Sequence, residues 1–388
     1  MSPMKHLVPA LRLFHGTDSL AALPAELKRL GSRRSVIVCG ASLIHEGAAL
    51  DLIRGAMGEL CAGVIGSVRA HSPLDAVEAT AAQIQRLEAD SVIAVGGGSA
   101  IVTARSASIL LAERADPRKL CTSRNSEGIL QSPKLLAPKL PQLVIPTTPT
   151  TATLKAGSAI LDPVDGKRLA LFDPQTRAKA VFIHPALLKT PPRDLIVSSG
   201  LNTLVMAIEG LTSRSGDPFS DALLMHSARL LAQRLPEVQL NDGDDVRSDL
   251  MFASLMCGHG TDYTGAGIAI PLGHAISARF HVDNGTANAI VLPHVIRFNA
   301  DAAIVGLEKL ASAFNRPSKG PATICAVIDV IASLLDELRT PRRLRDIGVT
   351  RETLPELAAI SMEDWFVRQN VRPVRSANEL EEILERAW

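Results

Sequence analysis

Two histidines in the second half of the chain have the type and spacing for proton transfer. His274 and His281 are seven residues apart in the segment GAGIAIPLGHAISARFHVDNGTANAIVLPH (265–294), and seven residues is close to two turns of a helix. We therefore expect both imidazoles to face one cleft, where a ring that titrates near neutral pH can act as a general acid or base. The alternative is that both are structural histidines.

Three consecutive glycines follow an apolar run and precede a helical pattern. Gly96, Gly97 and Gly98 come directly after SVIAV (91–95). Glycines at the start of a helix leave backbone N–H groups open to an anion such as a pyrophosphate, which the helix dipole also favours. Ser99 is placed to cap that helix. The alternative is a tight strand-to-helix turn without a ligand, because the GxGxxG pattern of dinucleotide sites is absent.

A second candidate loop is rich in hydroxyl groups. The stretch IPTTPTTATLKAG (145–157) has five threonines within seven positions, directly after the predicted strand 143–148. Hydroxyls at the carboxyl end of a parallel strand lie where open α/β sheets bind ligands. We therefore select Thr147, Thr148 and Thr151 as candidate cofactor contacts beside the glycine loop. A threonine-rich surface loop is the alternative.

The segment GLNTLVMAIEG (200–210) poses a chemical question. Asn202 and Met206 stand four positions apart in an apolar, helix-favouring run, so they project from the same helix face. Helices use this spacing to hold metal ions. An amide and a thioether are poor ligands for a hard metal, however, so the spacing and the side-chain chemistry disagree.

These segments need a scaffold of alternating strands and helices in the first half of the chain. Apolar runs predict strands at 36–40, 91–97, 143–148, 169–174 and 180–185. Amphipathic runs predict helices at 19–31, 49–60, 73–89 and 99–115. Strands that alternate with helices indicate a parallel sheet with helices on both faces. The polar stretch 123–142 is expected to be a long surface connection.

After Pro192 the pattern changes to long amphipathic segments without strands. Helices are predicted at 194–214, 219–238, 244–260 and 376–388. Ser376 and Glu379 have the spacing of a capping box at the start of the last helix. We therefore predict an α/β domain over 1–190 and an all-helical domain over 191–388, with a cleft between them.

The composition narrows the classes of partner. The chain has 388 residues, of which 46% are hydrophobic, and its 41 Lys and Arg nearly balance its 40 Asp and Glu. This balance provides no general attraction to nucleic acid or to an anionic membrane. The five cysteines include no CxxC pair, and no signal peptide or apolar run of about 18 residues is evident. We expect a cytoplasmic protein with a small-molecule substrate.

With these motifs in this order, the chain resembles the iron-containing, or group III, alcohol dehydrogenase family, which also includes the maleylacetate reductases. The resemblance covers nearly the whole length. It is carried by FHGTDSLAALPAELKRLG, AVGGGSAIVTAR, IPTTPTTAT, SGLNTLVMAIEG, GHAISARFHVDNGTANAIVLPHVIRFN, TPRRLRDIGV and NVRP. It implies a dehydroquinate synthase-like architecture, in which a Rossmann-like amino-terminal lobe binds NAD(P), a helical lobe carries the catalytic metal, and the protein is a homodimer.

The departures from the family pattern concern the metal site. The resemblance places the family's four metal ligands at Asn202, Met206, Ile270 and Asn284, and none of these residues is the expected aspartate or histidine. We therefore expect no metal there. An unpaired buried carboxylate would be costly without its cation, so replacing aspartate by Asn202 is physically coherent.

The cofactor lobe also departs from the pattern. Val102 stands where the family's GGGSxxD has its aspartate, and the loop that matches TGSE reads TATL (151–154). Gly40 stands where relatives that prefer NAD often have an aspartate, so NADPH is admissible.

These departures lead to a metal-independent hypothesis. His274 matches a histidine that the family retains near its active site, so it is our first choice for the general acid, and His281 is the second. Asn202 and Asn284 are expected to donate hydrogen bonds to the substrate. The resulting hypothesis is an NAD(P)H-dependent reductase of a small activated carbonyl or oxo-acid. The alternatives are a lyase or isomerase that reuses the site, and a binding protein without chemistry.

Overall fold

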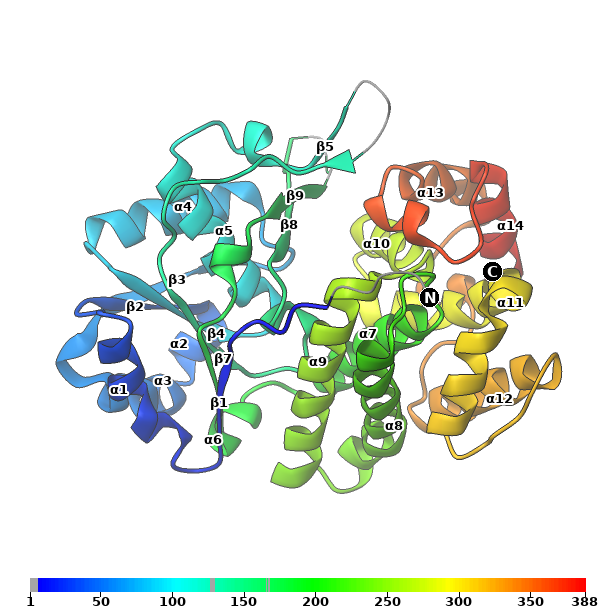
Figure 1. Ribbon diagram of the computed structural model, residues 1–388, viewed down its shortest axis with the longest axis horizontal. Coiled ribbons are helices and arrows are strands. Elements are labelled where there is room, and N and C mark those ends of the chain that lie inside the picture. The colour runs from blue at the N-terminus through cyan, green and yellow to red at the C-terminus, as the bar shows by residue number, and fades with distance from the viewer. Residues whose placement is uncertain (1–5, 126–129, 165, 167) are drawn as a thin grey trace. The chain divides into compact units, whose positions relative to one another are not determined.

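The computed structural model describes residues 6–125, 130–164, 166 and 168–388, which form two compact units. One unit comprises residues 8–191, and the other comprises residues 192–388 together with residues 6 and 7. The first is an α/β unit and the second is helical (Figure 1). The predicted fold class is therefore confirmed.

A six-stranded sheet forms the centre of the α/β unit, and all its neighbouring strands are parallel. The strand order is β1-β10-β7-β4-β2-β3. These strands are β1 (Arg12–His15), β2 (Ser35–Gly40), β3 (Cys61–Val68), β4 (Ser91–Gly96), β7 (Gln142–Pro146) and β10 (Ala180–Ile183). The helices of this unit are α1 (Leu23–Arg29), α2 (Ala41–His45), α3 (Ala48–Met57), α4 (Leu74–Arg86), α5 (Gly98–Glu113) and α6 (Pro185–Leu188).

The central strands are apolar on both faces, because helices cover both sides of the sheet. On one face, Ile37, Ile93 and Val95 join a buried cluster with residues of α1 and α3. Their neighbours Val36 and Val92 point to the opposite face and are also fully buried. The helices α4 and α5 contact β3 and β4 (Figure 1).

Two predicted segments of the α/β unit differ from expectation. The strand predicted at 169–174 forms β9 (Arg168–Phe172), which pairs with β8 (Gly157–Leu161) in an antiparallel hairpin outside the main sheet. The connection predicted at 123–142 contains a second short hairpin of β5 (Ser123–Arg124) and β6 (Leu130–Gln131). Residues 126–129 of that stretch lie outside the described residues.

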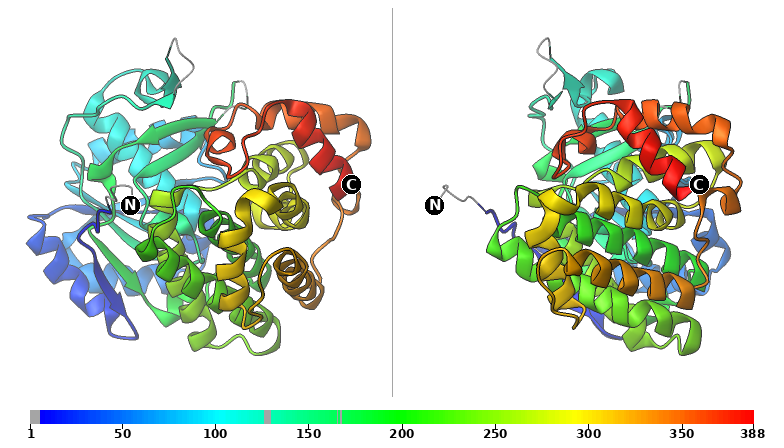
Figure 2. Two further views of the ribbon diagram at one scale, coloured as in Figure 1. Left: turned by 45° about the vertical axis from the view of Figure 1, so that its right-hand side comes forward. Right: turned by 90° about the vertical axis from the view of Figure 1, so that its right-hand side faces the viewer.

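The helical unit has one extensive core to which all its long helices contribute. They are α7 (Arg193–Leu211), α8 (Pro218–Leu240), α9 (Asp244–Thr264), α10 (Ala269–Phe280), α11 (Asn284–Ala313), α12 (Ala322–Glu337), α13 (Leu354–Ser361) and α14 (Ala377–Ala387). Within this unit α13 contacts α10, and α14 contacts α11; α13 is orange and α14 is red in Figure 2.

One helix of this unit starts with an ordinary side-chain cap, whereas another lacks the cap that the sequence predicts. Asp217 caps α8 by accepting hydrogen bonds from the backbone N–H groups of Phe219 and Ser220. The capping box predicted at Ser376 and Glu379 does not form. Ser376 makes no side-chain cap bond, and the carboxylate of Glu379 instead accepts from the backbone N–H of Arg375.

Two helices, α7 and α11, are long and apolar enough to cross a membrane by length and composition. This corrects the expectation that no apolar run reaches that length. Of their most apolar windows, 72% and 50% respectively are buried inside the protein. Core helices of a folded domain pass the same test, and both of these contribute to the core of the helical unit.

The contact between α7 and α11 is unusually close, and it determines where the polar side chains of these helices lie. A Cβ atom at Gly285 would lie 1.9 Å from the carbonyl oxygen of Ser198. Only glycine fits this position without separating the helices. A similar constraint holds α10 against α11, because a Cβ atom at Gly273 would lie 1.6 Å from Oδ1 of Asn288.

Candidate active site

The structure brings the predicted cofactor residues to one edge of the parallel sheet. Gly40 ends β2, Gly96 ends β4, and Thr147 follows the end of β7. These three strands are neighbours in the sheet, so their carboxyl ends lie side by side. The chain runs from β2 outward to β3 and then back across to β4, which makes the β2/β4 junction a topological switch point. Open α/β sheets bind ligands at such a point.

The glycine loop has the conformation of a strand-to-helix turn. Gly96 has a positive φ of 138°, which favours glycine, and Gly97 is the N-cap residue of α5. No side chain caps this helix, so the prediction that Ser99 does so is wrong: α5 already begins at Gly98, which places Ser99 inside its first turn.

The threonine loop lies directly against the glycine loop. The backbone N–H of Thr147 donates to the carbonyl of Gly96 at 3.0 Å. A Cβ atom at Gly97 would lie only 2.8 Å from Oγ1 of Thr148. Thr151 begins a buried 3₁₀ turn that ends at Thr153. Position 97 therefore favours glycine partly because a larger residue would collide with Thr148. The two loops together form one surface of backbone amides and hydroxyls.

A buried arginine that we did not predict supports the threonine loop. Arg105 on α5 is fully buried, and its guanidinium donates to the carbonyl oxygens of Ala152 and Gly157, each at 2.7 Å. These carbonyls flank the end of the loop, so Arg105 anchors it to α5. The sequence offered a faint signal, namely a single charged residue within the otherwise uncharged run SAIVTARSAS (99–108).

In the helical unit, the structure gathers the four positions that the family resemblance assigns to metal ligands. Nδ2 of Asn288 donates to Oδ1 of Asn202 at 2.8 Å, and Asn284 precedes Asn288 by one turn of α11. Met206 follows Asn202 by one turn of α7, and Met206 and Ile270 belong to the same buried core. The four positions therefore lie on α7, α10 and α11, three helices that contact one another.

The side chains at these positions do not suit iron or zinc. Met206 is 6% exposed and Ile270 is 2% exposed, and both are packed as core residues. Isoleucine has no lone pair, thioether sulfur prefers softer ions, and neutral amides are weak ligands. Within the described ranges, no group of three or more His, Cys, Asp or Glu side chains is placed to hold a metal ion.

The asparagine side chains have unused hydrogen-bonding capacity. Oδ1 of Asn284 and Oδ1 of Asn288 are buried, and neither has a hydrogen-bond partner among the described residues. A buried polar atom without a partner is unfavourable, so these amides favour a polar ligand beside them. Sequence analysis missed Asn288, although it stands one helical turn after Asn284 in DNGTANA (283–289).

A buried carboxylate anchors the start of α10. The carboxylate of Glu209 on α7 accepts from the backbone N–H groups of Gly267 at 2.9 Å and Ala269 at 2.7 Å. Burial raises the pKa of Glu209 to about 7; hydrogen bonds from Ala269, Gly267 and Ile270 lower it, and the charge of Asp364 raises it. Glu209 thereby fixes the helix that carries Ile270.

His274 and His281 have different surroundings. Nδ1 of His274 lies 3.1 Å from Oδ2 of Asp364, and the two side chains are only 17% and 10% exposed. His281 is exposed, and it follows the last residue of α10 in a left-handed conformation with φ 56°. The two-turn spacing does not apply to this pair, because α10 ends at Phe280. That both imidazoles face one cleft stays a prediction. The catalytic roles themselves stay predictions.

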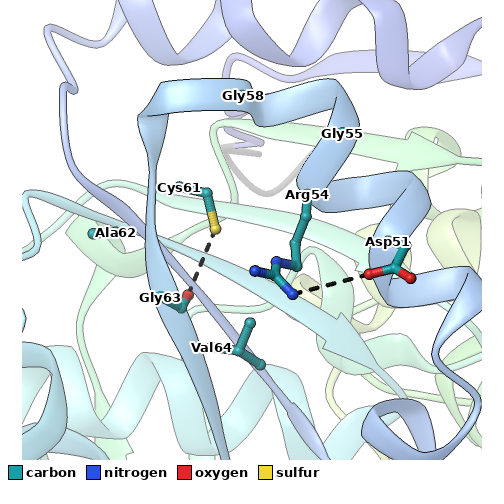
Figure 3. Close-up of a pocket in the computed structure, with 8 residues that line it drawn as sticks. All are labelled: Asp51, Arg54, Gly55, Gly58, Cys61, Ala62, Gly63 and Val64. Carbon is teal, nitrogen blue, oxygen red and sulfur yellow. Dashed lines mark hydrogen bonds and ion pairs between the residues drawn. The ribbon is translucent and has the colours of Figure 1, made fainter.

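A surface hollow lies elsewhere in the α/β unit. It has a volume of about 820 Å³ and is found where α3 ends and the edge strand β3 begins (Figure 3). Its lining residues are Asp51, Arg54, Gly55, Gly58, Cys61, Ala62, Gly63 and Val64. None of the predicted site residues is among them. Since β3 begins there, the hollow is at the amino-terminal end of the parallel strands, opposite the glycine loop.

Comparisons with known proteins agree with this arrangement. Residues 10–185 match the model of the iron-containing alcohol dehydrogenase family, and residues 196–388 match the model of the carboxy-terminal part of the Fe-containing alcohol dehydrogenases. Lactaldehyde reductase of Escherichia coli K12 is 28% identical, with 96% of this chain and 97% of that protein covered. Maleylacetate reductase 1 of Cupriavidus pinatubonensis is 26% identical, with 97% and 95% covered.

Solved structures show the same fold. A putative alcohol dehydrogenase from Ralstonia eutropha JMP134 superposes with a TM-score of 0.82 at 25% identity, covering 100% of this chain and 98% of that one. An alcohol dehydrogenase from Oenococcus oeni superposes with a TM-score of 0.90 at 21% identity, covering both chains completely (100% each). The chain therefore belongs to the iron-containing alcohol dehydrogenase family and is an NAD(P)-dependent enzyme of the alcohol dehydrogenase and reductase type.

Proposed function

We propose that this enzyme reduces a small activated carbonyl or oxo-acid with NAD(P)H and without a catalytic metal. One observation carries the proposal: the positions assigned to metal ligands hold Asn202, Met206, Ile270 and Asn284, whereas His274 and both strand-end loops are retained. In this proposal the side chains that would bind the cation are missing, whereas a candidate proton donor and candidate cofactor loops are present.

The cofactor is proposed to bind at the strand ends of the α/β unit. Backbone N–H groups at the start of α5, from Gly98 and Ser99, suit a pyrophosphate, and Thr147 and Thr148 add hydroxyls beside it. Gly40 has no carboxylate to repel a 2′-phosphate, so both NADH and NADPH are candidates. When bound, the reduced nicotinamide supplies a hydride equivalent.

His274 is the proposed proton donor. Reduction of a carbonyl leaves negative charge on its oxygen, and a donor placed at that atom stabilises the charge as it develops. In this proposal His274 transfers one proton to the oxygen, which produces the hydroxyl group of the product. Solvent then returns a proton to the imidazole.

The asparagines are proposed to bind the substrate through neutral hydrogen bonds. Asn202 already accepts from Asn288, whereas Oδ1 of Asn284 has no partner among the described residues. An amide can turn either its oxygen or its nitrogen toward a ligand, so Asn284 can accept from a hydroxyl or donate to a carbonyl. Neutral groups at this position avoid the desolvation cost of an unpaired buried charge.

Carbonyl reactivity and the names of relatives both support an activated carbonyl or oxo-acid as the substrate. Without a metal to polarise the carbonyl, an activated substrate such as an oxo-acid is the easier one to reduce. One relative is named a maleylacetate reductase and another a lactaldehyde reductase, so both names denote reductases of small molecules, one an oxo-acid and one an aldehyde.

The test is oxidation of NADPH and NADH with a panel of oxo-acids and aldehydes, in the presence of a chelator. We expect turnover, and a His274→Gln variant is expected to lose about 10²- to 10⁴-fold in kcat, the usual contribution of a general acid. His226→Gln is the matched control, because His226 lies on α8 and pairs with Arg229 outside the site. Absence of turnover, together with absence of any change in nicotinamide fluorescence, would contradict the proposal.

The replacement of all four ligand positions also favours a second candidate, a lyase or isomerase that reuses the site. The same panel separates the two. Product formed without any nicotinamide would support the non-redox enzyme, whereas strict dependence on the reduced cofactor would exclude it.

A further inference from the structure

We propose that Asp364 is a positioning residue that holds the His274 imidazole with its proton on Nδ1. This inference rests on the proposed function, because it assigns His274 the role of proton donor. It adds a residue that lies 90 positions away from His274 in the chain and that no motif identified.

The contact is within hydrogen-bond distance and largely shielded from solvent, and a second hydrogen bond holds the carboxylate in place. Oδ2 of Asp364 lies 3.1 Å from Nδ1 of His274, and the side chains are 10% and 17% exposed. Oδ1 of the same carboxylate accepts from the backbone N–H of Phe366 at 3.0 Å, at the start of a 3₁₀ turn over Trp365–Gln369. The carboxylate therefore cannot rotate without breaking a helix cap.

The backbone of His274 is fixed as well. Glu209 binds the first N–H groups of α10, and Gly273 packs against Asn288 without room for a Cβ atom. The hydroxyl of Ser361, at the end of α13, is 3.4 Å from the carbonyl oxygen of Pro271. The helix that carries His274 is thus attached to α7, α11 and α13, which leaves the imidazole orientation as the remaining freedom.

The chemistry of the pair determines the proton positions. A carboxylate offers only acceptors, so Nδ1 must be the donor in this hydrogen bond. The proton transferred to the substrate oxygen therefore leaves from Nε2 of the imidazolium, and the product is a neutral imidazole with hydrogen on Nδ1. Asp364 keeps its hydrogen bond in both states, and its negative charge balances the imidazolium before transfer.

Two other carboxyl groups lie near the pair of Asp364 and His274. Glu209 approaches from α7, and the charge of Asp364 contributes to the raised pKa of Glu209. Glu363 precedes Asp364 in the chain. A variant that removes the charge at position 364 and leaves these two carboxylates in place isolates the effect of Asp364.

Asp364→Asn is the informative substitution. The asparagine oxygen can still cap the turn at Phe366, but its amide presents N–H groups to Nδ1 and favours the opposite tautomer. We expect kcat to fall about 10- to 100-fold or more, as when the acidic partner of a working histidine is changed, with KM nearly unchanged. We also expect the pH at which the reduction rate has fallen by half to move down by about one unit or more, since the imidazolium loses its counter-charge.

The helical unit contains a matched control. Asp217 caps α8 and also lies 3.1 Å from Nδ1 of a histidine, His6, so it makes the same two kinds of contact away from the site. Asp217→Asn should leave kcat, KM and the pH profile unchanged. If both variants lost activity equally, the role of Asp364 would be structural only.

A second measurement is independent of turnover. Nitrogen-15 NMR of imidazole-labelled protein, with the His274 signals assigned by a His274→Gln variant, reports which ring nitrogen carries the proton. We expect the Nδ1–H form in the unmodified protein and its loss in Asp364→Asn. A His274 ring protonated only on Nε2 would overturn the inference even if the enzyme is active. Conversely, the Nδ1–H form in a protein without reductase activity would reject the proposed function but retain the pair.

Discussion

The two candidate sites of this enzyme consist of different chemical groups. The candidate cofactor site at the strand ends is made of backbone amides and threonine hydroxyls, on loops that Gly96 and Gly97 allow to approach each other. The site of the helical unit is made of side chains on α7, α10 and α11, at a close helix contact. Departures from the family pattern in the first site leave its backbone amides in place, whereas those in the second concern every side chain that the resemblance assigns to a metal ligand.

The difference shows which kind of site can change its side-chain chemistry without losing its geometry. A site made of backbone atoms depends on the backbone conformation. A side-chain change such as Val102 in place of the family's aspartate alters contacts around the site but leaves the backbone amides in place. A site made of side chains on rigid helices keeps its geometry when the side chains change. Asn202 and Asn284 stand where the resemblance implies ionisable ligands, and the helices α7 and α11 still pack together at these residues.

The largest effect on stability is expected where the helical site depends on geometry. Gly285→Ala would place a methyl group 1.9 Å from the carbonyl oxygen of Ser198, so α7 and α11 must separate. We expect a loss of about 3 kcal/mol or more in the free energy of unfolding, measured by denaturant titration. Gly55→Ala on α3 is the control, because a Cβ atom there meets nothing within 4 Å. It should be neutral or slightly stabilising. Equal destabilisation by both would refute the close contact.

A second difference between the sites is pH dependence, since the helical unit buries Glu209. Its folded-state pKa is raised from 4.5 to about 7, so the stabilisation from its protonated form is fully present below about pH 4.5 and is lost as the pH rises past about pH 7. The expected change is about 3 kcal/mol in the free energy of unfolding, since each pKa unit corresponds to about 1.4 kcal/mol. Unfolding should be measured across this range. Glu209→Gln should flatten that part of the profile, and an unaltered slope would contradict the assignment.

The smallest effect on stability is expected at the cofactor loops, where the substitution affects ligand binding instead. Gly97→Ala places a methyl group 2.8 Å from Oγ1 of Thr148, and that hydroxyl must move. We expect NADPH to bind about 10-fold more weakly, a cost of about 1.4 kcal/mol, in a nicotinamide fluorescence titration. Gly157→Ala is the control, because a Cβ atom there meets nothing within 4 Å. Similar affinities for the two variants would argue against this loop as the cofactor site.

Much of the fold could be predicted from sequence, because the buried strands are long apolar runs. The runs at 36–40, 91–97 and 143–148 correspond to β2, β4 and β7, the three strands whose ends carry the predicted cofactor residues. Two edge strands were missed. The β1 strand has only four residues, most of them exposed, and β3 is interrupted by Gly63 and Gly66, so neither has a continuous apolar run.

The helical site was less predictable, because its pairs are distant in the chain. Asn202 and Asn288 are 86 positions apart, and His274 and Asp364 are 90 apart. Periodicity places a residue on a helix face but does not identify the helix that packs against it. Similarly, the seven-residue spacing of His274 and His281 assumes one continuous helix, and spacing alone does not show that the helix ends at Phe280.

The central claim is that the helical site works without a divalent metal, and metal content tests it most directly. The purified enzyme would be incubated with Fe²⁺ or Zn²⁺, freed of excess metal and analysed by mass spectrometry, in parallel with an Asn284→Ala variant. We predict no stoichiometric metal in either protein and reductase activity that a chelator does not reduce. One equivalent of metal per chain that disappears in Asn284→Ala, with activity that requires it, would contradict the account.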